Sequence, residues 1–188
     1  MNLILFASGS GSNAENVCKH FQHHPDIRIQ ALFCNNPKAG VIKKMEAFQV
    51  PVHVFSKAEF SDANQFLKSI QSFQPDYIVL LGFLWKIPPF LVAAYPNRII
   101  NLHPALLPKF GGKGMYGHHV HEAVKQAGEK ETGITIHLVD EHYDEGKIIA
   151  QYRCKVDESD TVDQIADKIH LLEMEFVPQA IAQVVLRK

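Results

Sequence analysis

Two side chains that can act on a carbonyl group, Asn101 and His103, stand two residues apart near the middle of the chain. They follow two isoleucines and precede Pro104 and Pro108, which cannot extend a β-ladder. We therefore expect both at the carboxyl end of a strand, where residues two apart project to the same side. In that arrangement the amide can stabilise a developing oxyanion while the imidazole transfers a proton. A buried Asn and His that merely end a strand would give the same local pattern.

A second candidate for chemistry is the Ser-Gly-Ser-Gly-Ser-Asn stretch at residues 8–13. It follows the apolar run 2–7, which is typical of a strand covered on both faces, and it precedes an apolar stripe at helical spacing. A strand, a glycine turn and a helix place backbone amides where they can hold a phosphate. The other interpretation is a tight turn that needs Gly9 and Gly11 only for positive φ.

The same stretch also fits Gly-x-Gly-x-x-Ala, the dinucleotide fingerprint, so a nicotinamide-dependent oxidoreductase is an alternative function. However, the second expected strand, at 27–34, is followed by Asn35-Asn36-Pro37 and offers no Asp or Glu for a ribose 2′-hydroxyl. That alternative also leaves Asn101 and His103 without a role. A catalytically silent nucleotide-binding or partner-docking module is a second alternative.

Strand and helix patterns alternate along the chain and predict the elements that must position these residues. Repeated β-α units with short connections indicate an α/β protein with a doubly wound, mostly parallel, Rossmann-like sheet, a C-terminal antiparallel strand and a final helix. Ligands of such sheets bind outside the carboxyl ends of the strands, where segments 9–13, 82–87 and 101–103 would meet. Further strands are expected at 52–55, 77–82, 132–139 and 147–156, and helices at 41–48, after a cap at Ser61, around 120–127 and from 160–161 onward.

Length and composition limit the class of protein. With 188 residues, 46% hydrophobic residues and no long polar tract, we expect one domain spanning residues 1–188. A formal net charge of -1 and a pI near 6.8 give no general attraction to nucleic acid or anionic lipid, so an anionic ligand must be bound locally. The apolar segment 3–7 is too short for a signal peptide or a membrane span, so a cytoplasmic location is expected.

The cysteines and histidines do not indicate a metal site. The three cysteines are odd in number and far apart, so neither a disulfide framework nor a thiolate zinc site is expected. His118 and His121 share one face of a predicted helix, but no carboxylate or thiolate is suitably spaced, and a solvated helix start explains them. The glycine-rich segment 109–117 before that helix predicts either a mobile loop that can close over a site or a flexible excursion on the surface.

Four motifs, taken in their order, resemble the phosphoribosylglycinamide formyltransferases, which are folate-dependent enzymes of purine synthesis. They are the stretch at 8–13, Asn-Leu-His-Pro-Ala-Leu-Leu-Pro at 101–108, Thr-Gly-Ile-Thr-Ile-His at 132–137 and Asp-Glu-Gly at 144–146. The resemblance covers essentially the whole chain. The wider family, with methionyl-tRNA formyltransferase and formyltetrahydrofolate deformylase, is similar around Asn101, His103 and the acidic loop. The 8–13 stretch points to the ribonucleotide enzymes.

The resemblance implies a role for each matching residue. The catalytic residues of the family match Asn101, His103 and Asp144. The family's loop that holds the ribonucleotide phosphate matches Gly11, Ser12 and Asn13, and the acid that binds the ribose hydroxyls matches Glu173. The folate-binding residues match Leu84, Ile87, Asn101, Asp140 and Asp144, with the backbone between the last two. His137 would support the acidic loop that carries Asp144.

The reaction that the resemblance implies is transfer of a formyl group from 10-formyltetrahydrofolate, a co-substrate, to the amino group of glycinamide ribonucleotide in de novo purine biosynthesis. Attack of the amine would form a tetrahedral intermediate whose oxyanion is stabilised by Asn101 and a protonated His103. Asp144 would hold His103 or pass the surplus proton toward the departing folate nitrogen. No metal, nucleic acid or membrane is implied, and the protein would be a monomer or homodimer.

The sequence departs from the family pattern at several positions near the expected ligands. The glycine loop 111–117 is longer than in the best-known bacterial members, and Trp85-Lys86 replaces a segment that often carries an Arg near the folate tail. Glu145 stands where Gly is common, and His170 stands where other members have Gln. Because these changes leave the three catalytic positions intact, we expect the chemistry to be retained while the ligand contacts differ.

Overall fold

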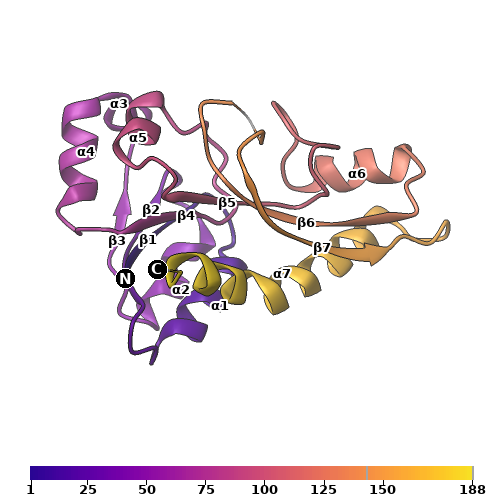
Figure 1. Cartoon of the computed structure of the whole chain (residues 1–188), viewed down its shortest axis with the longest axis horizontal. Coiled ribbons are helices and arrows are strands. Elements are labelled where there is room, and N and C mark those ends of the chain that lie inside the picture. Colours follow the sequence, from indigo (N-terminus) through magenta and orange to yellow (C-terminus); the bar gives the residue numbers. More distant parts are fainter. Residues whose placement is uncertain (143, 188) are drawn as a thin grey trace.

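The computed structural model describes residues 1–142 and 144–187, and these form a sheet of seven strands in the order β3-β2-β1-β4-β5-β6-β7 (Figure 1). The strands from β3 to β5 in this order are parallel, whereas β6 pairs antiparallel with both β5 and β7. The chain order reverses between β1 and β4, which opens a crevice at the carboxyl ends of these strands. The strands are β1 (Asn2–Ala7), β2 (Arg28–Cys34), β3 (Val52–Val54), β4 (Tyr77–Leu80), β5 (Ile99–His103), β6 (Glu131–Leu138) and β7 (Ile148–Lys155).

Helices cover both faces of this sheet. One face is covered by α1, α2 and α7, and the other by α3, α4 and α5, while α6 packs against α7 at the far end of the sheet (Figure 1). The helices are α1 (Ser12–Phe21), α2 (Gly40–Glu46), α3 (Lys57–Ser61), α4 (Ala63–Gln71), α5 (Pro89–Ala94), α6 (His118–Gln126) and α7 (Val162–Val185). The long helix α7 begins at a capping box, in which Thr161 and Gln164 satisfy each other's backbone N–H groups.

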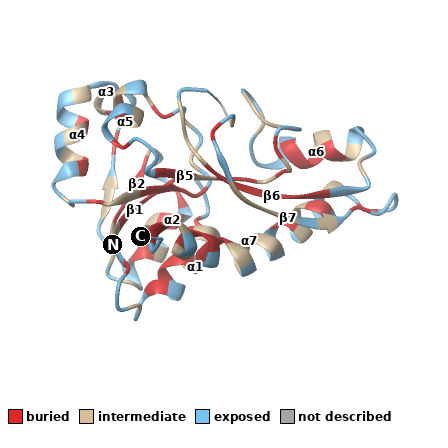
Figure 2. Cartoon of the chain, viewed as in Figure 1, coloured by how far each residue is buried: buried red, intermediate tan, exposed pale blue. Residues whose placement is uncertain are grey.

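The central strand β1 is buried on both faces, as Figure 2 shows for the middle of the sheet. Leu3 and Leu5 pack into the core shared with α1, α2 and α7, whereas Ile4 and Phe6 pack into the opposite core. The opposite core is rich in aromatic rings, and Phe6 stacks on Phe33 with ring centroids 5.2 Å apart. Packing on both faces fixes the carboxyl ends of the central strands, which is where the candidate site lies.

The register between β5 and β6 arranges the polar residues at the end of β5. Asn101 pairs with His137 and His103 pairs with Thr135, so all four side chains share one face of the sheet. Leu102 packs into the core on the other face. The expectation that Asn101 and His103 end a strand and project to the same side is therefore confirmed.

The predicted fold class is confirmed, and the differences lie in local details. The antiparallel part comprises two strands, β6 and β7, and the short helices α3 and α5 were not expected from the sequence. The expected cap at Ser61 is wrong, because Ser61 is the last residue of α3. The N-cap of α4 is Asp62, whose carboxylate accepts hydrogen bonds from the N–H groups of Asn64 and Gln65 and also favours the positive end of the helix dipole.

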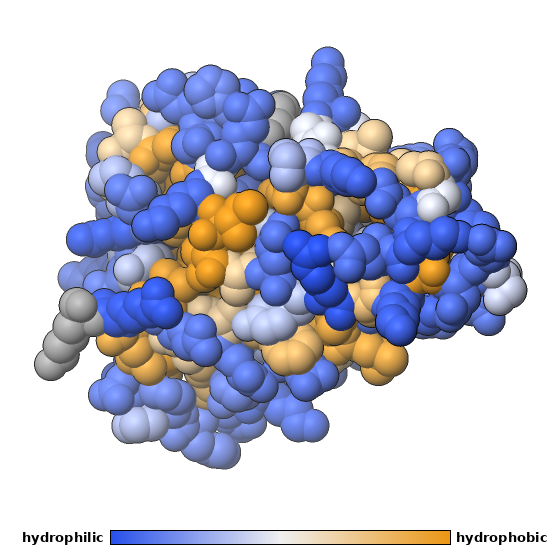
Figure 3. Space-filling model, turned by 45° about the vertical axis from the view of Figure 1, so that its right-hand side comes forward, coloured by the Kyte–Doolittle hydropathy of each residue, from blue (hydrophilic) through white to orange (hydrophobic). Residues whose placement is uncertain are grey.

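The face drawn in Figure 3 is mostly hydrophilic, with hydrophobic side chains gathered near its middle. The large hydrophobic residues that are exposed include Leu84 and Tyr116, and both line the cavity described below. Of the helices in the described part of the chain, none is long and apolar enough to cross a membrane.

The contact between β6 and β7 predicts a sharp stability effect at Gly133. A Cβ atom on Gly133 would lie 1.9 Å from the Tyr152 carbonyl oxygen, so the two strands would have to separate. We expect Gly133→Ala to lower the free energy of unfolding by about 1–3 kcal/mol, the usual cost of overpacking. Gly9→Ala is the matched control, because a Cβ there meets no described atom within 4 Å. Urea unfolding of both variants measures the difference, and equal stabilities would contradict the close approach.

Candidate active site

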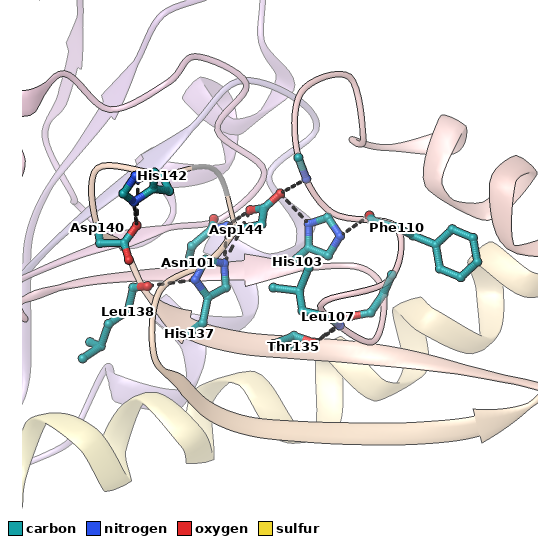
Figure 4. A network of polar contacts seen from close by, with 12 residues as sticks. Asn101, His103, Leu107, Phe110, Thr135, His137, Leu138, Asp140, His142 and Asp144 are labelled. Atoms are coloured by element: carbon teal, nitrogen blue, oxygen red, sulfur yellow. Dashed lines mark hydrogen bonds and ion pairs between the residues drawn. The ribbon is translucent and has the colours of Figure 1, made fainter.

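Three polar side chains from two segments converge at the carboxyl end of β5 (Figure 4). Asn101 and His103 come from β5, and Asp144 comes from the loop that joins β6 to β7. Asn101 Nδ2 lies 3.5 Å from Asp144 Oδ1, and His103 Nδ1 lies 3.6 Å from Asp144 Oδ2. The structure thus brings together the three residues that the sequence resemblance implies as catalytic.

His137 fixes the orientation of the Asn101 amide. The Leu138 carbonyl oxygen is 2.8 Å from His137 Nδ1, so this nitrogen carries a proton and donates it. In the neutral ring His137 Nε2 is then an acceptor, and it lies 3.1 Å from Asn101 Nδ2. One N–H of the Asn101 amide is therefore directed to His137, and the second points toward Asp144 and the cavity. His137 Nε2 is also 3.6 Å from Asp144 Oδ1, so the ring contacts the acidic loop.

The glycine loop supplies backbone groups that sequence reasoning did not anticipate. The Phe110 carbonyl oxygen is 2.7 Å from His103 Nε2 and accepts the proton of that nitrogen. The Gly112 N–H donates to Asp144 Oδ2 at 2.9 Å. A Cβ on Gly111 would lie 3.2 Å from the Asp144 Cβ, so the loop backbone packs closely on this residue. In this structure the loop therefore holds two of the three converging side chains, although backbone groups leave no signal in the sequence.

A hydroxyl in β6 anchors the segment between His103 and the glycine loop. Thr135 Oγ1 donates to the Ala105 carbonyl oxygen at 2.7 Å and accepts from the Leu107 N–H at 3.0 Å. Gln151 of β7 donates from Nε2 both to Thr135 Oγ1 and to the Leu107 carbonyl oxygen, each at 2.9 Å. The two antiparallel strands therefore position the chain that carries Phe110.

The electrostatics of the cluster leave a charged carboxylate beside a neutral imidazole. Burial raises the pKa of Asp144, but His137, His103 and the Gly112 N–H together lower it by a larger amount. The net pKa is therefore below its ordinary value. Burial lowers the pKa of His103 below its ordinary value, although Asp144 and the Phe110 carbonyl raise it in part. From the sequence we expected a protonated His103. In the site without ligands, desolvation instead favours the neutral ring.

A cavity of about 500 Å³ lies beside this cluster. Its wall includes Asn101, His103 and Asp144, and it also includes residues for which the sequence resemblance implied ligand contacts. These are Asn13, Leu84, Ile87, Asp140 and Glu173. Gly11 and Ser12 lie at the start of α1 beside Asn13 but do not line the cavity. Tyr143, within the expected folate-binding backbone, lies outside the described residues.

Asn13 and Glu173 form a second polar group in the cavity wall. Asn13 Nδ2 donates to Glu173 Oε2 at 2.9 Å, and His170 Nδ1 is 3.7 Å from the same oxygen. Burial raises the pKa of Glu173, and Asn13 and His170 lower it in part. Asn13 Oδ1 is buried and has no partner among the described residues. An unpaired buried amide oxygen is costly, and a ligand that donates a hydrogen bond would satisfy it.

His121 does not fit its expected place at a solvated helix start. Its side chain is buried and lines the cavity, whereas His118 and His119 are exposed. The sequence did carry a signal for this burial, because His121 follows Val120 and precedes Val124 on the buried stripe of α6. Within the described residues, no group of three His, Cys, Asp or Glu side chains is arranged to hold a metal ion.

Residues 1–181 match the formyl transferase family, and the chain therefore belongs to that family. It is 38% identical over 187 residues to phosphoribosylglycinamide formyltransferase, chloroplastic, of Arabidopsis thaliana, covering 93% of this chain and 63% of that protein. It is 36% identical over 184 residues to phosphoribosylglycinamide formyltransferase of Bacillus subtilis, covering 95% of this chain and 92% of that protein.

A solved structure agrees with these sequence relatives. The crystal structure of phosphoribosylglycinamide formyltransferase from Bacillus halodurans superposes with a TM-score of 0.90 at 31% identity, covering 100% of this chain and 96% of that one. The resemblance to the phosphoribosylglycinamide formyltransferases that the sequence motifs indicated is thereby confirmed.

The contact between His103 and Asp144 predicts a measurable change in titration. Because the Asp144 charge raises the pKa of His103, Asp144→Asn should lower that pKa further. At any pH near the titration midpoint, a smaller fraction of His103 would then be protonated. NMR of the histidine ring over a pH series measures this change, with His103→Gln used to assign the resonance. An unchanged or raised midpoint in Asp144→Asn would contradict the electrostatic coupling.

Proposed function

We propose that this chain is an enzyme that transfers a formyl group from 10-formyltetrahydrofolate to the amino group of glycinamide ribonucleotide in purine biosynthesis. The observation that carries this proposal is the convergence of Asn101, His103 and Asp144 on one cavity. The printed names of the relatives, which are phosphoribosylglycinamide formyltransferases, support glycinamide ribonucleotide as the acceptor. Transfer of a one-carbon group between two nitrogen atoms needs a hydrogen-bond donor that stabilises the oxyanion and a group that carries a proton, and these side chains offer both.

The cavity wall offers two kinds of surface, which supports the binding of two different substrates. Asn13 and Glu173 present acceptor oxygens that suit the hydroxyl groups of a ribose. The N-terminus of α1 has no side-chain cap among the described residues, and its amides suit a phosphate beside Asn13. Leu84 and Ile87 add apolar area that suits the ring system of a folate.

Asn101 is the proposed hydrogen-bond donor to the oxyanion. When the amine attacks the formyl carbon, a new C–N bond forms and the carbonyl oxygen takes up negative charge. His137 occupies one N–H of the Asn101 amide and so directs the second toward the cavity. A preorganised donor of this kind typically lowers the barrier by about 2.7–4 kcal/mol.

His103 is the proposed proton carrier. In the free site its Nε2 proton is held by the Phe110 carbonyl, so the Nδ1 lone pair faces Asp144. Nδ1 takes the surplus proton from the attacking nitrogen, and the ionised Asp144 stabilises the imidazolium that results. The proton then moves to the folate nitrogen as the old C–N bond breaks, which restores the neutral ring. The low pKa of Asp144 keeps its carboxylate charged throughout this cycle.

One assay of product formation tests the proposed function. The purified chain is given glycinamide ribonucleotide and 10-formyltetrahydrofolate, and the formylated ribonucleotide and tetrahydrofolate are measured. We expect one of each product per turnover, with no product when formate and ATP replace the folate. Absence of turnover with bound ribonucleotide would favour a silent binding module, and binding of NAD(P)H in a fluorescence titration would favour an oxidoreductase.

Substitution of the three converging residues separates a catalytic from a structural role. Asn101→Ala should reduce kcat about 10²–10³-fold while leaving the binding of both substrates largely intact. Asp144→Asn should reduce kcat by orders of magnitude, and its combination with His103→Ala should cost much less than the product of the single effects. Steady-state kinetics, substrate titration and thermal unfolding are measured together.

Glu145→Gln is the matched control for these variants, because Glu145 is an exposed acid next to Asp144 in the same loop. It should retain the kcat of the original chain. Active variants at the three positions, or variants that unfold early and bind neither substrate, would overturn the assigned roles.

A charge change at Asn13 tests where the ribonucleotide binds. Asn13→Asp places a carboxylate against Glu173 and beside the proposed phosphate, so repulsion should raise KM for the ribonucleotide about tenfold or more. KM for the folate should change much less. Asn16→Asp is the control on the same helix, because Asn16 donates to the Met174 carbonyl and does not line the cavity. Equal effects on both substrates would contradict this placement.

Gly11 is a poor probe of the same site. Its φ is 75°, and a Cβ atom would lie 2.3 Å from the Val41 side chain. A larger residue there would therefore disturb the packing of α1 on α2 before it could obstruct a phosphate. For this reason the test relies on Asn13, whose side chain faces the cavity.

A further inference from the structure

One imidazole in the cavity wall has no role in the proposed reaction. His121, in the first turns of α6, is 7% exposed and lines the same cavity as His103. Its Nδ1 is fully buried, and neither ring nitrogen has a hydrogen-bond partner among the described residues. The two preceding histidines of the helix are different, because His119 Nδ1 contacts Glu122 at 3.3 Å and His118 Nε2 contacts the same residue at 3.8 Å. An unpaired buried imidazole costs stability, and a bound ligand that pairs with the ring would offset this cost.

The two ring nitrogens of His121 face different surroundings. Nδ1 is sealed from solvent and has no hydrogen-bond partner within the described part of the chain. Nε2 is not sealed in this way, so it belongs to the small part of the ring that is exposed. Burial, with the neighbouring His118 and His103, lowers the pKa of His121 and favours the neutral ring. A buried N–H without an acceptor costs more than a buried lone pair, so the proton belongs on Nε2. The ring therefore presents a neutral N–H donor to the cavity.

The position of α6 indicates which part of a ligand this donor can reach. His118 Nδ1 lies 4.0 Å from Asp163 Oδ1, and Val124 packs with Ile165, so α6 lies against the first half of α7. The same helix α7 carries Glu173 into the cavity. His103 lines the same cavity wall as His121 and contributes to lowering the pKa of His121. The donor thus lies between the converging catalytic side chains and the helix that carries the proposed ribose contacts.

We propose that His121 donates a hydrogen bond from Nε2 to the carbonyl oxygen of the glycinamide group of the ribonucleotide. This inference rests on the proposed function, which places the amino group at Asn101, His103 and Asp144 and the ribose at Asn13 and Glu173. The amide carbonyl is the acceptor that lies between these two parts of the substrate. His121 is thus a substrate-binding residue that sets the position of the attacking amine.

Calorimetric titration with glycinamide ribonucleotide alone tests this contact without turnover. His121→Leu should raise Kd about tenfold, the same factor should appear in KM for the ribonucleotide, and KM for the folate should change less than twofold. His121→Gln should retain the affinity, because its amide nitrogen occupies the position of Nε2. His121→Asn places its amide at the position of Nδ1 and should be as weak as His121→Leu. His119→Leu, on the exposed side of the same helix, is the control and should bind like the original chain.

Thermal unfolding separates a binding role from a structural one. His121→Leu removes the buried, unpaired Nδ1 from the helix α6, so its Tm should equal or exceed that of the original chain. A lower Tm with unchanged affinity, or equal affinities for the Gln and Asn variants, would overturn the inference. If the original chain binds the ribonucleotide and His121→Leu binds it equally well, this inference alone fails. If the original chain does not bind the ribonucleotide, the proposed function fails with it.

Discussion

The carboxylate of Asp144 is the constraint on which the site depends, because its side chain is only 12% exposed and yet carries a charge. A buried charge is tolerated only when hydrogen bonds and opposite dipoles replace the lost water. Asp144 receives the Gly112 N–H at 2.9 Å and lies within 3.6 Å of Asn101, His103 and His137. The groups that donate hydrogen bonds to the carboxylate, the Gly112 N–H and the Asn101 amide, come from the glycine loop and from β5, so the charge is compensated only when both segments are in place.

The antiparallel arrangement of β6 makes this assembly possible. Because β6 runs against β5, His137 lies opposite Asn101, and the following loop turns back across the end of the sheet to present Asp144. This return is tight, since a Cβ on Gly146 would lie 1.8 Å from the Leu138 carbonyl oxygen. The same β6 backbone carbonyl, at Leu138, fixes the proton of His137 and through it the amide of Asn101. The hairpin of β6 and β7 thus supplies the carboxylate of Asp144 and, through His137, orients the Asn101 amide of β5.

Sequence reasoning succeeded where side-chain period and chain order carry the information. Alternation in a strand placed Asn101 and His103 on one side, and the β-α order indicated the sheet class. It failed where backbone groups or competing caps decide, as at the Phe110 carbonyl, the Gly112 N–H and the cap at Asp62. The expected solvation of His121 was wrong because the histidine sits on the apolar stripe of α6, and burial of that stripe outweighed the polarity of one ring.

The distribution of charge also bears on how a nearly neutral chain would hold the strongly anionic substrate of the proposed function. The formal net charge is -1, so long-range attraction contributes little, and the local groups must supply the affinity. The N-terminus of α1, which has no side-chain cap among the described residues, offers partial positive charge without a buried cation and so avoids the desolvation cost of a Lys or Arg. In the proposed reaction, Asn101 and His121 would act as neutral donors deeper in the cavity. The charged Asp144 would lie where the proton moves, because a carboxylate has its largest effect where the charge of His103 changes.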